Sequence, residues 1–143
     1  MKVTFFEPMN DLEFYGIGLG KVISDLVEHQ GADKFLLGGF TPFAFSVISA
    51  VKKLKEKYPY IECIVVLAEE PDISDMSELK TDPRRIYMPA LSAFGKRDAE
   101  LVRDVWLVDH SDIVVCYPPQ DGKKDERFIN YATRKGKTVL YAE

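Results

Sequence analysis

The fold of this chain is decided by residues 61–68, which read IECIVVLA and are apolar at every position except Glu62. Such a continuous apolar run is typical of a strand that is covered on both of its faces. Strands of that kind belong to parallel sheets, because the helices that connect parallel strands lie on both sides of the sheet. The stretch therefore predicts an α/β protein built on a parallel sheet.

The segments on either side continue this pattern, since short apolar runs alternate with longer stretches of helical spacing. We expect further strands at residues 3–6, 34–37, 85–87, 112–117 and 137–141, and helices at residues 16–30, 42–57, 96–110 and 125–135. In the helix at 96–110, the residues expected to face inward are Leu101, Val102, Val105, Trp106 and Val108. The alternation predicts a three-layer Rossmann-like fold with a mostly parallel sheet of five to six strands.

The composition is that of one globular domain spanning residues 1–143, with 46 % hydrophobic residues, 29 % charged residues and a formal net charge of −4. An acidic chain lacks the basic surface that nucleic acid or an anionic membrane attracts, so neither is expected as a partner. No run approaches the roughly 20 apolar residues of a membrane helix. The first strand runs into Glu7 and Pro8 instead of a signal-peptide cleavage site, which predicts a cytoplasmic protein.

Metal and cofactor motifs are missing from the sequence. Cys63 and Cys116 each lie in an apolar run, which predicts buried, reduced thiols on separate strands. Neither cysteine has a CxxC or Cys/His spacing, and His29 and His110 fall near helix ends, as capping or surface residues do. The stretch GIGLG at residues 16–20 lacks the G-x-G-x-x-G spacing of dinucleotide sites, so we expect it to open the first helix. No metal and no cofactor is predicted.

Ligands of open parallel sheets bind beyond the carboxyl ends of the strands, near a reversal in strand order. After the second strand, Gly38 and Gly39 would let a ligand approach the backbone, and the helix that follows offers N–H groups to an anion. A tight strand-to-helix turn would require glycine as well, so both interpretations stay open. Arg97, Arg103 and Asp104 are candidate ligand contacts, and a solvated helix face with ion pairs is the alternative for them.

The order of landmarks along nearly the whole chain resembles the SLOG superfamily, the Rossmann-like group that includes the DprA and LOG proteins. Within that group, the chain is most similar to the small YpsA-like bacterial domains. The resemblance rests on TFF at residues 4–6, Gly38-Gly39, Phe43, LKEKYP at 54–59, RDVWLVDHSD at 103–112 and GKTV at 136–139. The most specific parts are Tyr58-Pro59 and the block at residues 106–112.

The resemblance implies a domain that binds a nucleotide or nucleotide-derived ligand at the carboxyl ends of the strands. The expected ligand-binding residues are Glu7, Gly38, Gly39, Phe40, Thr41, Phe43, Arg97, Arg103, Asp104, Gly122 and Lys123. Departures from the family fall on this pocket: Glu7-Pro8-Met9 replaces Gly-His-Arg, Ala44 replaces Asp, Asp104 replaces Asn and Gly122-Lys123 replaces Gly-Gly. We therefore expect a degenerate nucleotide site, with low affinity for ordinary nucleotides and no demonstrated catalysis.

Two further functions stay open. The first is hydrolysis or transfer at an N-glycosidic bond, with Glu7, Glu69, Glu70 or Asp72 as nucleophile or base. The Pro-Gly-Gly-x-Gly-Thr-x-x-Glu pattern of the superfamily's phosphoribohydrolases does not occur. The second is a homo-oligomeric regulatory or interaction subunit, in which aromatic residues near the ligand end form a subunit surface.

Overall fold

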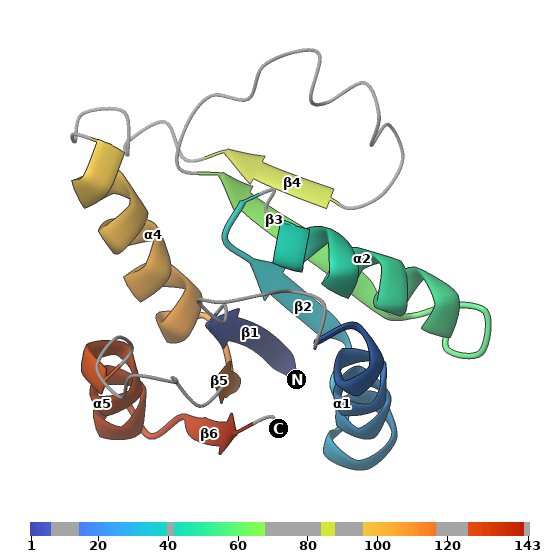
Figure 1. The fold of residues 1–143 in the computed structure, drawn as a ribbon. Coiled ribbons are helices and arrows are strands. Elements are labelled where there is room, and N and C mark those ends of the chain that lie inside the picture. The colour runs from blue at the N-terminus through green and yellow to red at the C-terminus, as the bar shows by residue number, and fades with distance from the viewer. Residues whose placement is uncertain (7–14, 40–41, 68–83, 88–95, 117–125, 142–143) are drawn as a thin grey trace.

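Figure 1 shows the fold in a computed structural model, which describes residues 1–6, 15–39, 42–67, 84–87, 96–116 and 126–141. The strands are β1 (Lys2–Phe6), β2 (Lys34–Leu37), β3 (Glu62–Leu67), β4 (Arg84–Tyr87), β5 (Ile113–Cys116) and β6 (Thr138–Tyr141). The helices are α1 (Tyr15–Gln30), α2 (Pro42–Leu54), α4 (Lys96–Asp109) and α5 (Glu126–Arg134). Each element lies where the sequence pattern predicts it, to within a few residues at its ends.

The strands form one sheet in the order β4-β3-β2-β1-β5-β6, and every neighbouring pair is parallel. Residues Cys63 to Leu67 of β3 are buried, as expected of a strand with neighbours on both edges and cover on both faces. The predicted α/β fold with a mostly parallel sheet is confirmed.

Helices cover both faces of the sheet, so the molecule has three layers (Figure 1). Helices α1 and α2 pack on the face that carries Val3, Phe5, Phe35 and Val65. Helices α4 and α5 pack on the opposite face, where alternate residues of the same strands point. The predicted buried cysteines follow this alternation, because Cys63 belongs to the first core and Cys116 to the second, and both are free thiols.

An aromatic group joins α2 to the sheet in the first of these cores. The ring of Phe5 lies 6.2 Å from that of Phe35 and 5.9 Å from that of Phe43, measured between ring centroids. Phe5, Phe6 and Phe35 are buried, as the sequence predicts. The stretch at residues 16–20 lies within α1, also as predicted.

The inward face of α4 differs from the prediction. Leu101 and Val102 are 42 % and 37 % exposed, whereas Val105 and Trp106 are half-buried and Val108 is buried. Ala99 and Leu107 are also buried, at 2 % and 3 % exposure. The sheet-facing stripe therefore follows positions 99, 103 and 107, spaced by four residues as on one face of a helix. The prediction was wrong for Leu101 and Val102 because it followed the apolar residues, and this stripe carries a charge at position 103.

The two histidines lie at the surface near helix ends, as predicted. His110 donates from Nδ1 to the carbonyl oxygen of Trp106, at 2.9 Å, and its ring stacks on that indole with centroids 3.9 Å apart. None of the helices in the described ranges combines the length and apolar character that crossing a bilayer requires.

Candidate functional site at the carboxyl edge of the sheet

The order of the strands reverses beside β1, at the centre of the sheet. The chain proceeds from β1 through β2 and β3 to β4 on one side, and then returns to place β5 and β6 on the other. Parallel sheets bind ligands at such a reversal, beyond the carboxyl ends of the strands, because the connections there separate and leave a crevice. Here those ends are Phe6 of β1, Leu37 of β2 and Cys116 of β5.

The turn that leaves β2 at this edge is made by Gly38 and Gly39. Gly39 has φ +109°, a backbone conformation that residues with a side chain rarely adopt. At Gly38 the constraint is space instead of φ, since a Cβ on that residue would lie 3.1 Å from Nε of Arg103 and 3.2 Å from Cδ1 of Leu107. Glycine is therefore favoured at Gly39 by its backbone conformation, and at Gly38 because any side chain would require Arg103 and Leu107 to shift.

The side chain of Arg103 lies directly over this turn. A Cβ on Gly39 would be 3.6 Å from its Nη1 atom, so the guanidinium group spans both glycines. Arg103 reaches the turn because it occupies the sheet-facing stripe of α4, between Ala99 and Leu107. The glycine pair and the arginine thus form one arrangement, in which the guanidinium group lies against a backbone turn that carries no side chains.

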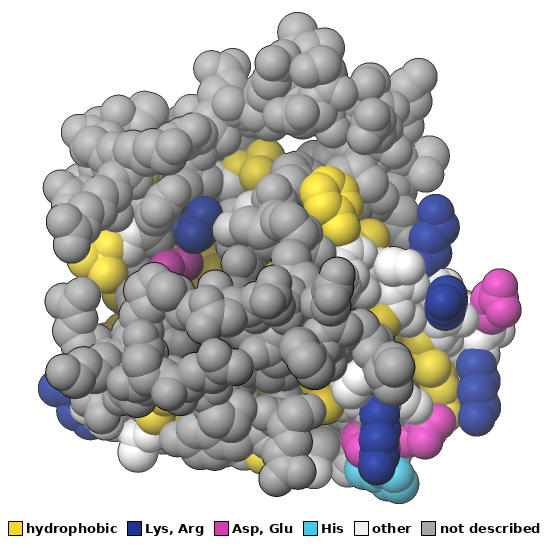
Figure 2. All heavy atoms as spheres, viewed as in Figure 1, with side chains coloured by type: hydrophobic (Ala, Val, Ile, Leu, Met, Phe, Trp, Pro, Cys, Tyr) yellow, Lys and Arg dark blue, Asp and Glu magenta, His cyan; other side chains and the backbone are white. Residues whose placement is uncertain are grey.

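Burial makes this arginine unusual. Its side chain is only 15 % exposed, and a cation removed from water to that degree is costly unless a partner compensates it. The partner in the structure is Asp104, whose Oδ1 atom accepts from Nε at 3.2 Å and from Nη2 at 3.1 Å. Figure 2 shows a basic and an acidic side chain side by side over α4.

The pair leaves part of the guanidinium group available. An arginine has five N–H donors, and the two bonds to Asp104 use one on Nε and one on Nη2. Within the described part of the chain, the hydrogen bonds and the ion pair of this guanidinium group are made with Asp104. The Nη1 atom lies near the Gly38–Gly39 turn, 3.6 Å from where a Cβ on Gly39 would be, and its N–H donors are of the kind that bind an anionic group.

Four of the residues expected at the ligand site come together here: Gly38, Gly39, Arg103 and Asp104. Phe43 lies instead in the core, 2 % exposed and packed on Phe5. Arg97 lies within α4, but its side chain is outside the described part. The other expected residues, Glu7, Phe40, Thr41, Gly122 and Lys123, also lie outside the described residues, as do the candidate nucleophiles Glu69, Glu70 and Asp72.

Sequence reasoning did not include Leu107 in the site. Its Cδ1 atom would lie 3.2 Å from a Cβ at position 38, the second close contact there. The signal that could have identified it is the four-residue spacing of Ala99, Arg103 and Leu107, which places all three on one helix face.

The described side chains include no group of His, Cys, Asp and Glu arranged to hold a metal ion. The chemistry that this edge offers is recognition of an anion by a partly buried guanidinium group, with a carboxylate beside it.

In comparisons with known proteins, no protein-family model matches this chain and no curated protein matches its sequence. The SLOG resemblance therefore depends on the motifs quoted above and stays a prediction.

Proposed function

We propose that this chain binds a small nucleotide-derived or other anion-bearing ligand at the carboxyl ends of β1, β2 and β5, through a degenerate nucleotide site. One observation carries the proposal. Arg103 occupies a position of α4 where the fold favours an apolar residue, and it lies over the Gly38–Gly39 turn, where the lack of side chains leaves room for it. A cation retained on a sheet-facing stripe costs stability, which is typical of functional sites.

The neighbouring carboxylate explains why ordinary nucleotides are expected to bind weakly. Asp104 already takes two donors of Arg103, so the pair has no net charge. A phosphate group entering this edge gains the attraction of the guanidinium group and meets the repulsion of the carboxylate. An asparagine at position 104, the residue type of the resembling family, would accept a hydrogen bond without that repulsion.

Position 44 supports the same proposal. Ala44 is 1 % exposed and belongs to the core beneath α2. The resembling family has an aspartate at this point of its motif, which could accept a ribose hydroxyl. An alanine in the core has no group for that purpose, so one contact expected of a nucleoside is replaced by packing. The proposal concerns binding and assigns no reaction.

The test is a thermal-shift series with nucleoside monophosphates, diphosphates and cyclic nucleotides. We expect small shifts for the wild type and larger shifts for Asp104→Asn, because the competing charge is removed while Arg103 stays. The double variant Arg103→Gln, Asp104→Asn should show no such increase in the thermal shift. Asp25→Asn, on the exposed face of α1, is the matched control for loss of one negative charge and should behave as the wild type.

Two results would contradict this proposal. A ligand present at about 100 times its Kd adds about 2.7 kcal/mol to stability, so a shift of that size for the wild type with any ordinary nucleotide would show an intact nucleotide site. An equal response from Asp104→Asn and from the double variant would remove Arg103 as the anion contact.

A further inference from the structure

The pair of Arg103 and Asp104 presents two opposite charges side by side at the carboxyl edge of the sheet. The two side chains are 15 % and 28 % exposed, and Nη2 of Arg103 lies 3.1 Å from Oδ1 of Asp104. Both groups are partly removed from water, which strengthens the interaction of each with a charge brought beside it. Because the two formal charges sum to zero, a ligand complements the pair best when it also carries one charge of each sign.

The guanidinium group of Arg103 has two edges that each carry parallel N–H donors. Asp104 occupies the edge formed by Nε and Nη2, and a single oxygen atom, Oδ1, accepts both of these hydrogen bonds. The second edge consists of Nη1, the atom that approaches Gly39, and the remaining N–H of Nη2. Two parallel donors match the two oxygen atoms of a planar carboxylate, which accepts from both at once.

The carboxylate of Asp104 is suited to the opposite kind of ligand group. An ionised carboxylate accepts about four hydrogen bonds, and Arg103 supplies two, both to Oδ1. The group therefore has acceptor capacity beyond the ion pair, on a side chain that is partly exposed. An ammonium group donates hydrogen bonds and carries the charge that a carboxylate attracts, so it complements Asp104 as a carboxylate complements Arg103.

We propose that the ligand of this edge is an α-amino acid or a related zwitterion, whose carboxylate pairs with Arg103 and whose ammonium group pairs with Asp104. This inference rests on the proposed function, since it names the class of anion-bearing ligand for the same site. In an α-amino acid one carbon atom joins the two charged groups, so they lie close together, as the charged groups of Arg103 and Asp104 do. Each ligand charge then lies beside an opposite charge.

A phosphate ester is a poorer complement to the same pair. It carries about −1.5 to −2 charge near neutral pH, and it has no ammonium group for Asp104. The free energy of removing an ion from water rises with the square of its charge, whereas its attraction to a pair without net charge rises only in proportion to it. A zwitterion with single charges avoids most of that desolvation cost and also uses the second member of the pair.

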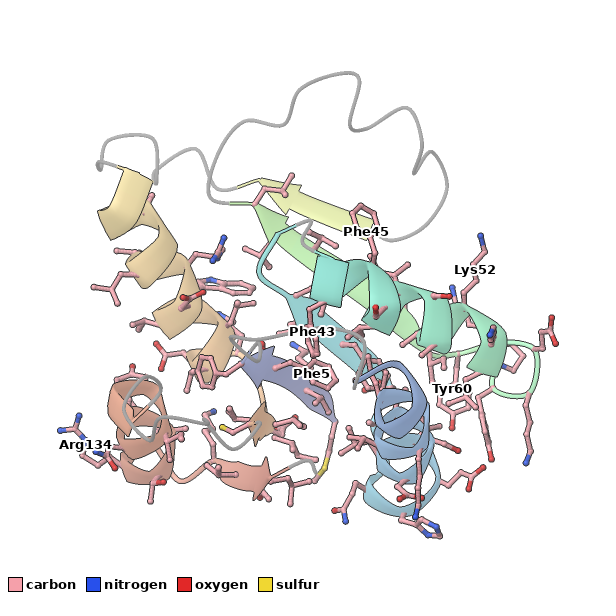
Figure 3. The ribbon with its side chains drawn as sticks, viewed as in Figure 1. Phe5, Phe43, Phe45, Lys52, Tyr60 and Arg134 are labelled. Carbon is pink, nitrogen blue, oxygen red and sulfur yellow. The ribbon has the colours of Figure 1, made fainter. Side chains whose placement is uncertain are left out.

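The described residues beside the glycine turn also favour a ligand smaller than a nucleoside. Phe43 points toward Phe5, between α2 and the sheet (Figure 3), and it is only 2 % exposed. Its ring therefore provides no surface on which a nucleobase could stack. The side chain of Ala44 is buried too and has no polar atom for a ribose hydroxyl. In the described part of the chain, recognition at this edge thus depends on the ion pair.

The first test is a thermal-shift series of the wild type with each standard α-amino acid. At about 10 mM, an amino acid with a Kd of about 100 µM is close to saturation, and we expect at least one of them to raise the melting temperature. Its N-acetyl derivative lacks the ammonium group and its carboxamide lacks the carboxylate. Each derivative should bind at least about tenfold more weakly, because it loses a charged hydrogen bond. These measurements need no variant to fold.

The second test compares variants of the pair. Asp104→Asn should weaken the binding of the amino acid by at least about tenfold, although the same substitution is expected to increase the response to nucleotides. The double variant Arg103→Gln, Asp104→Asn should lose both responses. Asp25→Asn, the matched control on the exposed face of α1, should bind the amino acid as the wild type does. Circular dichroism verifies that each variant is folded.

Three results would overturn the inference: no amino acid shifts the wild type, the N-acetyl derivative binds as tightly as the free amino acid, or the double variant retains full binding of the amino acid. In each of these cases, an increased nucleotide response of Asp104→Asn would still support the anion site under Arg103. An equal nucleotide response of Asp104→Asn and the double variant contradicts the proposed function instead, so the two failures are distinguishable.

Discussion

At the scale of single residues, the two glycines after β2 have different roles although they are adjacent. Gly39 is required by its φ of +109°, which is a property of its own backbone. Gly38 is favoured by its neighbours, because a Cβ there would lie within 3.1–3.3 Å of atoms of Arg103 and Leu107, which would have to shift. A substitution at Gly39 therefore strains the turn, and a substitution at Gly38 displaces the Arg103 side chain.

We expect Gly39→Ala to lower the free energy of unfolding by about 1–3 kcal/mol, the usual cost of a strained backbone conformation. Gly38→Ala should weaken ligand binding more than stability, since the flexible Arg103 side chain can move away. Gly20→Ala is the control: a Cβ there meets nothing within 4 Å, and alanine favours an exposed helix, so stability should rise. Urea unfolding measures all three, and unchanged stability of Gly39→Ala would contradict the assignment of strain.

Helix α4 shows at the scale of an element how a charged residue changes packing. Its sheet-facing stripe runs Ala99, Arg103, Leu107, so a cation stands where an apolar residue would bury more surface. Partly buried ion pairs stabilise little after their desolvation, and replacing both partners by uncharged residues of similar volume is often neutral or stabilising. Stability and ligand recognition therefore favour different residues at position 103.

We expect the double variant Arg103→Leu, Asp104→Asn, which leaves no uncompensated carboxylate, to keep stability unchanged or to raise it by up to about 2 kcal/mol, while any ligand response is lost. On the same stripe, Leu107→Ala should lose about 2–5 kcal/mol, as buried leucines do. Leu101→Ala, on the exposed face, should change stability by less than about 0.5 kcal/mol. Urea unfolding of these variants compares the positions, and severe destabilisation by the double variant Arg103→Leu, Asp104→Asn would show that the ion pair is structural.

Helix α4 also shows which features of the fold can be predicted from the sequence and which cannot. The extents of α4 and β3 follow from apolar periodicity and continuity, because those patterns reflect burial directly. The face of α4 that packs on the sheet could not be predicted in this way, since Arg103 interrupts the apolar stripe and the apolar Leu101 and Val102 lie outside it. Of the candidate site, the glycine turn and Arg103 were identified as separate motifs. Their contact depends on how α4 crosses the sheet, which is a tertiary property.

At the scale of the whole molecule, the two edges of the sheet differ in character. The carboxyl edge carries the glycine turn and the arginine. The amino edge is held by hydrogen bonds across strands: the Met1 amine donates to Asp33 Oδ1 at 2.9 Å, and the Lys2 amide donates to Asp112 Oδ2 at 2.9 Å. These hydrogen bonds fix the starts of β1, β2 and β5 relative to one another, and the proposed site at the opposite ends of these strands depends on that arrangement.

The hydrogen bond between the Met1 amine and Asp33 predicts a dependence of stability on pH. The hydrogen bond from the N-terminal ammonium group lowers the pKa of Asp33. A carboxyl group whose pKa is lowered on folding contributes stability above its ordinary pKa, about 3.9, and loses it as the pH falls through the lowered value. Wild type should therefore be more stable than Asp33→Asn at neutral pH, and the difference should shrink below about pH 4. Urea midpoints measured from pH 7 downward test this, and a constant difference would contradict it.

The central position of β1 also has a consequence for the order in which the protein is made. β1 is the first strand to leave the ribosome, and β5, its partner on one side, follows about 100 residues later. At a synthesis rate of about 5–20 residues per second, this edge of β1 stays unpaired for roughly 5–20 seconds before β5 is made. During this time the nascent chain can pair β1 with β2, β2 with β3 and β3 with β4, and the other edge of β1 is covered only after β5 has been made. Slowed translation after β4 would prolong the exposure of that edge to other chains.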